Sequence, residues 1–325
     1  MTGALILGCA GPVLTPGERD FFRDADPWGF ILFRRNIVDA AQTRALAESL
    51  RDCVGWHAPV FVDQEGGSVQ RLRPPLARDW PDASAQPGGA AAVRLRHRLM
   101  AAELAACGLD GDCAPVIDVL GPDTHPFLQR RIWSPEPAEV ATLARAAAEG
   151  LLAGGVLPVI KHLPGHGAAN ADSHHDLARC RLSLAELEAR DFVPVRALAD
   201  LPLGMTSHVV YDALDAETPA TLSAKVISYL RGALGFRGLL MTDDLCMNGL
   251  PGTLADRAGR AIAAGCDLAL HCSGDLAEMQ AVAAAAGPLT ATDRAARALA
   301  ARRPPAPIDI AAATADFERL SNAGA

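Results

Sequence analysis

The chain has 325 residues, of which 50% are hydrophobic and 21% are charged, so it carries enough apolar surface for a large buried core and is not disordered as a whole. Its formal net charge is −8, and it has no run of Lys and Arg with interleaved aromatic residues, which excludes nucleic acid as an expected partner. No stretch approaches the roughly 18 uninterrupted apolar residues of a membrane span, so a membrane is not expected as a partner either.

Short apolar runs alternate with helical patterns along the chain. The first run, at residues 4–8, could be mistaken for a lipoprotein processing site because Cys9 follows it, but no basic segment precedes it and we interpret it as a buried strand. Continuous apolarity is typical of strands that are buried on both faces of a parallel sheet. Eight strands are predicted in all, at residues 4–8, 29–33, 59–63, 114–118, 157–161, 203–207, 238–242 and 267–271.

The segments between these runs have the features of helices. Apolar residues follow helical spacing from Val140 to Leu151 and stop at Gly154, and Ser183 with Glu186 forms the pattern of a capping box. Eight strand–helix units predict a (β/α)₈ barrel of the TIM type, in a single domain.

Polar residues follow several different strands, which favours the barrel over an open, doubly wound sheet. A barrel collects its active-site groups from the carboxyl ends of many strands, whereas an open sheet concentrates them at one switch point. These residues are Asp63, Asp118, Lys161, His162, His208, Asp243, Asp244 and His271. We assign the barrel to residues 1–302 and a peripheral Pro/Ala-rich extension, with no chemistry of its own, to residues 303–325.

The eight cysteines are scattered along the chain and form no C-x-x-C pair. A chain of this length does not need a disulfide framework, so we interpret them as small hydrophobic residues in a reducing compartment. The expected location is therefore cytoplasmic.

The segment from Lys161 to Asp176 is the densest polar stretch, and it follows an apolar strand directly. Three interpretations compete for it. Its histidines could satisfy backbone carbonyls in an ordinary loop; a metal could bind among His162, His166, Asp172, His174 and His175; or Asp172 could orient His174 as an acid/base catalyst. We prefer the third interpretation, because the spacing matches no common metal-ligand signature and four histidines within fourteen positions are too many for a purely structural loop.

Two carboxylates, Asp243 and Asp244, end the seventh predicted strand. Consecutive strand residues point to opposite sides, so one is expected to face the barrel mouth as a nucleophile and the other to be a structural partner. Capping of the following helix is the alternative explanation. Together with a proton donor on the loop after the fifth strand, the pair of sites would suit retaining glycoside cleavage.

Four motifs in order resemble those of the β-N-acetylhexosaminidases of glycoside hydrolase family 3, in particular its single-domain members. They are VDQEGGSVQR at residues 62–71, APVID at 114–118, the segment from KHLPGHG at 161–167 to His174, and DDL at 243–245. The resemblance covers the chain from about the first strand to the eighth. It implies a TIM-type barrel and an exo-acting enzyme that removes terminal β-linked N-acetylglucosamine without a metal or a cofactor.

The resemblance also implies roles for individual residues. Asp243 would form a covalent glycosyl intermediate, and His174, paired with Asp172, would protonate the leaving oxygen and then activate water. The sugar hydroxyls would be bound by Asp63, Arg71, Arg131, Lys161 and His162. A surface salt bridge is the alternative for Arg131. The implied substrate is a small glycan or muropeptide from cell-wall recycling, such as N-acetylglucosaminyl-1,6-anhydro-N-acetylmuramic acid.

Other functions remain open on the sequence alone. The same fold and residues could serve phosphorolysis or a β-glucosidase. Lys161 could instead form a Schiff base with a carbonyl substrate, and a barrel that only binds sugar is the alternative outside catalysis.

Overall fold

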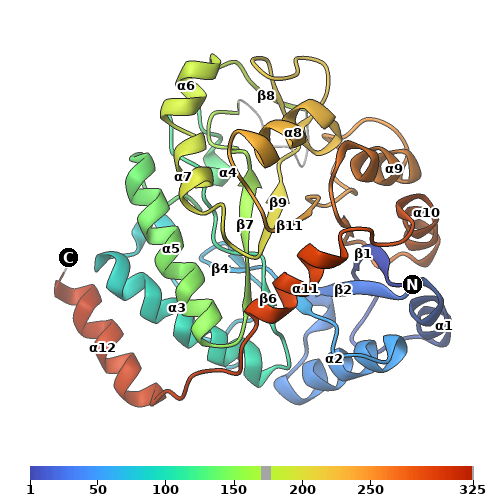
Figure 1. The fold of residues 1–325 in the computed structure, drawn as a ribbon. Helices are drawn as coiled ribbons and strands as arrows, with labels where there is room; N and C mark the ends of the chain where they lie inside the picture. The colour runs from blue at the N-terminus through green and yellow to red at the C-terminus, as the bar shows by residue number, and fades with distance from the viewer. Residues whose placement is uncertain (170–176, 324–325) are drawn as a thin grey trace.

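The computed structural model describes residues 1–169 and 177–323, and it confirms the predicted barrel (Figure 1). Eight strands form one sheet in which every neighbouring pair is parallel, in the order β11-β9-β7-β6-β3-β2-β1-β12. An isolated parallel bridge between Met241 and Leu268 joins the two outer members of this order and closes the sheet. The barrel strands are β1 (Gly3–Leu7), β2 (Pro27–Leu32), β3 (Val60–Val62), β6 (Gly111–Asp112), β7 (Leu157–Leu163), β9 (Leu203–Thr206), β11 (Leu239–Met241) and β12 (Ala269–His271).

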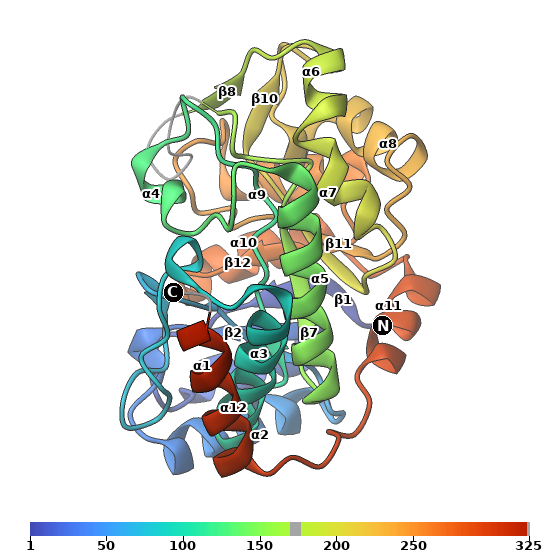
Figure 2. The same ribbon diagram turned by 90° about the vertical axis from the view of Figure 1, so that its left-hand side faces the viewer.

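Helices surround the strands, and α3 and α5 lie side by side along one flank of the barrel (Figures 1 and 2). The predicted helix after Val140 is α5, and the capping box of Ser183 and Glu186 starts α6 as expected. The helices are α1 (Pro16–Ala25), α2 (Ala40–Val54), α3 (Gly89–Ala106), α4 (Pro126–Gln129), α5 (Pro137–Ala153), α6 (Leu184–Ala189), α7 (Phe192–Ala197), α8 (Ala224–Gly232), α9 (Leu254–Ala264), α10 (Leu276–Ala286), α11 (Thr292–Ala301) and α12 (Ile310–Ala323).

Alternation along each strand divides the core into two layers. In β1, Ile6 belongs to the cluster inside the barrel, whereas Leu5 and Leu7 belong to the cluster between strands and helices. Both layers are fully buried, which explains why the strands are continuously apolar in sequence. In the interior layer Phe61 lies so close to β6 that a Cβ atom at position 111 would overlap its ring, so only Gly111 fits there.

The fourth strand differs from its prediction at residues 114–118. The regular ladder is formed by β6 at Gly111–Asp112, whereas residues 114–118 follow β7 with only isolated pairing, such as the Ile117 amide donating to the Lys161 carbonyl at 2.7 Å. Pro115 has no N–H to contribute to a ladder, which limits regular pairing in this segment. The apolar run therefore predicted a fourth strand in the right order along the chain, but the predicted strand begins three residues after the start of β6.

Four short strands lie outside the barrel sheet. β4 (Gln64–Gly66) pairs antiparallel with β5 (Val69–Gln70), directly after β3, and β8 (Ala178–Cys180) pairs parallel with β10 (Val209–Tyr211). All eight cysteines are free, and six of them are buried. Among the described residues, no helix combines the length and apolarity that crossing a membrane requires.

The chain beyond residue 302 ends in α12, which packs against α3 (Figure 2). Phe317 is 8% exposed and meets the ring of Trp80 edge-to-face, with 5.4 Å between the ring centroids. Trp80 also donates its indole N–H to Glu103 of α3 at 2.8 Å. The assignment of residues 303–325 to a separate extension stays a prediction, but α12 shares an apolar cluster with α3 and Trp80.

We expect Phe317→Ala to lower the free energy of unfolding by about 3 kcal/mol, because it removes a buried ring from the contact with Trp80. Denaturant titration followed by Trp fluorescence measures this change. Ile310→Ala is the matched control, since Ile310 is 47% exposed on the same helix and its truncation should cost no more than about 0.5 kcal/mol. Equal stability of the two variants would show that α12 contributes nothing to the fold.

Candidate active site

A pocket lies at the carboxyl ends of the barrel strands. It brings together every predicted site residue that the structure describes, although these residues come from segments far apart in the sequence. They are Asp63, Arg71, Arg131, Lys161, His162 and Asp243, and they share the pocket with Asp244, Phe33, Phe127 and Met247. Of the polar residues at predicted strand ends, Asp63, Lys161, His162, Asp243 and Asp244 line this pocket, whereas Arg71 and Arg131 were expected from the family resemblance alone.

Lys161, near the end of β7, is the centre of a buried ion-pair network. Its Nζ lies 2.9 Å from Asp63 Oδ1 and 2.6 Å from Glu65 Oε1, and its side chain is 3% exposed. Arg71 adds a second cation to Asp63, with Nη2 at 2.9 Å from Oδ2. Burial alone would raise the pKa of Asp63, but the charges of Lys161 and Arg71 outweigh burial and hold this pKa well below its usual range. Asp63 is therefore a carboxylate throughout the neutral range.

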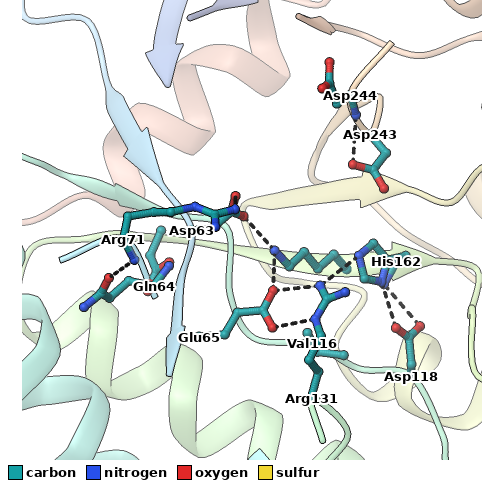
Figure 3. A network of polar contacts seen from close by, with 12 residues as sticks. Asp63, Gln64, Glu65, Arg71, Val116, Asp118, Arg131, His162, Asp243 and Asp244 are labelled. Atoms are coloured by element: carbon teal, nitrogen blue, oxygen red, sulfur yellow. Dashed lines mark hydrogen bonds and ion pairs between the residues drawn. The ribbon is translucent and has the colours of Figure 1, made fainter. Parts of the chain in front are cut away.

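Arg131 and Glu65 form a bidentate pair inside the pocket wall. Arg131 donates from Nε and Nη2 to the two oxygens of Glu65 at 2.9 and 2.8 Å, and both side chains are 7% exposed. Burial alone would lower the pKa of Arg131, but Glu65 outweighs burial and raises it. The alternative of a surface salt bridge is therefore wrong in its location, because the pair is buried and Glu65 also contacts Lys161. Figure 3 shows Glu65 and Arg131 facing each other.

His162 is held by Asp118. Its Nδ1 lies 2.7 Å from Asp118 Oδ2, and Asp118 Oδ1 also accepts the backbone N–H of His166 at 2.7 Å. Burial alone would raise the pKa of Asp118, but His162 and His166 outweigh burial and lower it to about 2. Asp118 is thus an acceptor for Nδ1–H, and this leaves His162 Nε2 directed at Arg131 Nη2, 3.4 Å away.

The loop after β7 packs tightly against its neighbours at two glycines. Gly165 has φ +140°, a conformation that L side chains rarely adopt, and a Cβ atom at Gly167 would overlap the backbone of Val119. The hydroxyl of Tyr211 donates to the carbonyl of Gly165. These contacts fix the chain as it leaves β7, up to Ala169, where the described part of this loop ends.

Asp243 follows β11 and lines the pocket apart from the ion-pair network (Figure 3). Its Oδ1 accepts the backbone N–H of Asp244 at 2.8 Å. Burial alone would raise the pKa of Asp243, but the nearby His208 and His162 and the Asp244 amide outweigh burial and lower it. Asp243 is therefore ionised at neutral pH, which a carboxylate nucleophile requires.

Asp244 is bound mainly by backbone. Its Oδ1 accepts the N–H groups of Cys246 at 3.0 Å and Cys272 at 3.2 Å, while its own carbonyl contacts His208 Nε2 at 3.0 Å. The predicted division between the two carboxylates fits this arrangement, with Asp244 as the residue that fixes the loop. Both residues line the pocket, and the carboxylate of Asp244 is the one that meets the surrounding loop backbone.

Asp172 and His174 lie outside the residues that the structure describes, as does His175. The acid/base and metal interpretations of that segment therefore stay predictions. In the sequence, this segment lies between β7, whose end carries Lys161 and His162, and β8, which begins at Ala178.

Three residues belong to the site although they were not predicted as part of it. Glu65 joins Lys161 to Arg131, Asp118 orients His162, and His208 supports the loop of Asp243 and Asp244. Asp118 and His208 were visible as polar strand ends, and Glu65 lies two residues after Asp63. Their partners could not be read from the sequence, because they come from other strands.

The electrostatics of Lys161 oppose the Schiff-base alternative. A lysine nucleophile must lose its proton, which requires a lowered pKa. Burial alone would lower the pKa of Lys161, but the carboxylates of Asp63 and Glu65 outweigh burial and raise it. Lys161 is therefore an ammonium ion and a hydrogen-bond donor in this pocket.

Comparison with known proteins shows the family of the chain. Residues 22–302 match the Glycosyl hydrolase family 3 N terminal domain. A β-hexosaminidase of Chromobacterium violaceum is 37% identical over 284 residues, covering 83% of this chain and 79% of the relative, and one of Alkalilimnicola ehrlichii is 39% identical over 290 residues, covering 84% and 81%.

Solved structures resemble the whole chain. NagZ from Neisseria gonorrhoeae superposes with a TM-score of 0.83 at 29% identity, covering 99% of this chain and 97% of that one. A glycoside hydrolase family 3 β-N-acetylglucosaminidase from Paenibacillus sp. superposes with a TM-score of 0.87 at 27% identity, covering 99% of this chain and 67% of that one. The chain therefore belongs to glycoside hydrolase family 3, in the group of its β-N-acetylhexosaminidases, and is a glycoside hydrolase.

Proposed function

We propose that the protein is a retaining exo-β-N-acetylglucosaminidase. Asp243 attacks the anomeric carbon and forms a covalent glycosyl ester, while His174, oriented by Asp172, gives a proton to the leaving oxygen. His174 then removes a proton from the water that hydrolyses the ester, so that the β configuration is retained.

The observation that carries this proposal is the position of Asp243. An ionised, half-buried carboxylate that lines the pocket shares it with charged groups that are all engaged with one another. Such a carboxylate suits attack on a sugar carbon, because it carries no proton to be removed first.

The ion-pair network supports a role in sugar binding. Asp63 is fixed by Lys161 and Arg71, so it can accept hydrogen bonds from hydroxyl groups without moving. Arg131 and Lys161 line the same pocket and offer N–H donors, and His162 lines it with its Nδ1–H already donated to Asp118. A neutral, hydroxyl-rich ligand is the class that a rigid array of donors and acceptors recognises best.

The use of a histidine in place of the second carboxylate fits work near neutral pH, since imidazole can both donate and accept a proton there. The named relatives include β-hexosaminidases and NagZ, which supports N-acetylglucosaminides as substrates. We further propose that the protein acts in the cytoplasm on N-acetylglucosaminyl-1,6-anhydro-N-acetylmuramic acid and its peptides during cell-wall recycling. Eight free cysteines fit such a reducing compartment.

Aryl β-glycosides that differ only at C2 test the substrate. We expect hydrolysis of the 2-acetamido substrate, and loss of turnover by more than about 10⁴-fold in Asp243→Ala because the nucleophile is gone. Release of the aryl group measures both. Turnover of the 2-hydroxy substrate alone would refute the proposed specificity, and a sugar 1-phosphate formed when phosphate is added would show phosphorolysis instead.

Replacement of His174 tests the acid/base role. His174→Ala should lower turnover by about 10²–10⁴-fold for a poor leaving group, and much less for a nitrophenyl group that needs little protonation to leave. His175→Ala is the matched control and should stay within a few-fold of the wild type. Equal losses in both variants would favour the metal interpretation of this segment, and no loss in His174→Ala would refute the acid/base assignment.

In the pH profile of kcat/KM, Asp243 should determine the decline on the acid side and His174 the decline on the alkaline side. The lowered pKa of Asp243 keeps the nucleophile ionised, so a decline on the acid side is expected only below the ordinary pKa of an aspartic acid. On the alkaline side kcat/KM should fall as His174 loses the proton that it must donate, near neutrality. His174→Ala should abolish the alkaline limb. An acid limb near pH 6 in the wild type would contradict the environment described for Asp243.

A further inference from the structure

Three side chains of metal-ligand type converge outside the ion-pair network, and one of them, Asp244, also lines the pocket. Asp244 and Cys246 lie on the loop after β11, and His271 ends the neighbouring strand β12. One ligand atom from each lies within 4.8 Å of the others, and Cys246 Sγ is 3.2 Å from His271 Nδ1. Carboxylate, thiol and imidazole together form a donor set that suits zinc.

The distance between the ligand atoms of Cys246 and His271 is close to that in a zinc site. Zn–S and Zn–N bonds of about 2.3 and 2.0–2.1 Å at tetrahedral angles place sulfur and nitrogen about 3.5 Å apart. The observed 3.2 Å between Cys246 Sγ and His271 Nδ1 differs from this by only a few tenths of an ångström. For this pair of ligands a small side-chain adjustment is therefore sufficient, and the Asp244 carboxylate oxygen, which lies within 4.8 Å of both, would move toward the ion.

The far side of the His271 ring is arranged as it is behind metal-bound histidines. Nε2 lies 2.9 Å from Ser273 Oγ and 3.4 Å from Glu278 Oε2, and the Ser273 hydroxyl donates to Glu278 at 2.6 Å. Because the one proton of that hydroxyl is directed at Glu278, Ser273 accepts from Nε2–H. Nδ1 then carries the lone pair, and this lone pair points toward Cys246. Such an outer carboxylate is the usual support of a metal-bound imidazole.

Asp244 is also held in place. Its Oδ1 accepts the backbone N–H groups of Cys246 and Cys272, one from each of the two segments that supply the other ligands. Asp244 and Cys246 are half-buried, whereas His271 is fully buried, so an ion can approach from the side of the two loop residues.

We propose that Asp244, Cys246 and His271 form a binding site for a thiophilic divalent cation such as Zn²⁺, with a coordination position left for water or a ligand. This site goes beyond glycoside cleavage and does not depend on it. The competing explanation is a Cys246 thiol that hydrogen-bonds to His271 within an ordinary packed loop.

Cobalt spectroscopy of the full-length protein tests the proposal without any variant. After treatment with a chelator and dialysis, one equivalent of Co²⁺ should produce a thiolate-to-cobalt charge-transfer band together with the visible bands of a tetrahedral ion, and Zn²⁺ should displace both. Cys246→Ser should remove the charge-transfer band. Absence of the band in the wild type, or its persistence in Cys246→Ser, would overturn the proposal.

Zn²⁺ affinity, measured by competition with a chromophoric chelator, tests the other residues. His271→Gln should weaken binding at least about 100-fold, and Glu278→Gln about 10–100-fold through the support of the imidazole. Cys53→Ser and His57→Gln are matched controls on and beside α2 and should bind as the wild type does. Thermal unfolding confirms that each variant is folded. Unchanged affinity in His271→Gln would refute the site and point to the histidines after β7.

Discussion

The structure of the site depends on one constraint, which is that two carboxylates and two cations must pair with one another inside one wall of the pocket. Asp63 and Glu65 follow β3, Lys161 is near the end of β7, and Arg131 follows α4, so the pairs form only when the barrel has closed. Removal of one partner from such a set leaves an uncompensated buried charge, which costs several kcal/mol. The network therefore holds the wall of the pocket in a single arrangement, against which a sugar can be positioned.

The network is in turn supported from behind. Arg96 of α3 is fully buried and donates to the backbone carbonyl of Glu65 at 2.7 Å. The guanidinium also lies over the rings of Trp80 and Trp133, at 5.8 and 5.7 Å from their centroids. Trp80 itself packs against Phe317 of α12. A helix at the periphery of the barrel is thus connected to the pocket through only a few side chains.

Much of the fold could be predicted because its cause is local. Runs of apolar residues predicted all eight barrel strands, and only the fourth was misplaced, at a proline that the apolar pattern does not register. Strand ends likewise predicted which polar residues meet. What the sequence could not provide is pairing: that Glu65 joins Arg131 to Lys161, or that Asp118 orients His162, depends on which strands become neighbours.

The same limit applies to the cysteines. Cys246 was interpreted as one of eight small hydrophobic residues, because the cysteines form no C-x-x-C pair. Its neighbours in space are the last residue of β12 and a serine and a glutamate beyond it. Asp244 and Cys246 are two residues apart, but the third ligand, His271, comes from another strand. The sequence therefore has no spacing that identifies the three as one set.

Of the five charges in the ion-pair network, two carboxylates and two cations cancel within a few ångströms, and Arg71 adds a third cation beside Asp63. The paired groups therefore present strong local dipoles, and the network as a whole keeps a single net charge. Mobile ions in solution act on long-range fields and hardly reach buried pairs. The affinity for an uncharged sugar should therefore hold across a wide range of ionic strength, whereas any charged part of the substrate outside this wall would make recognition depend on salt.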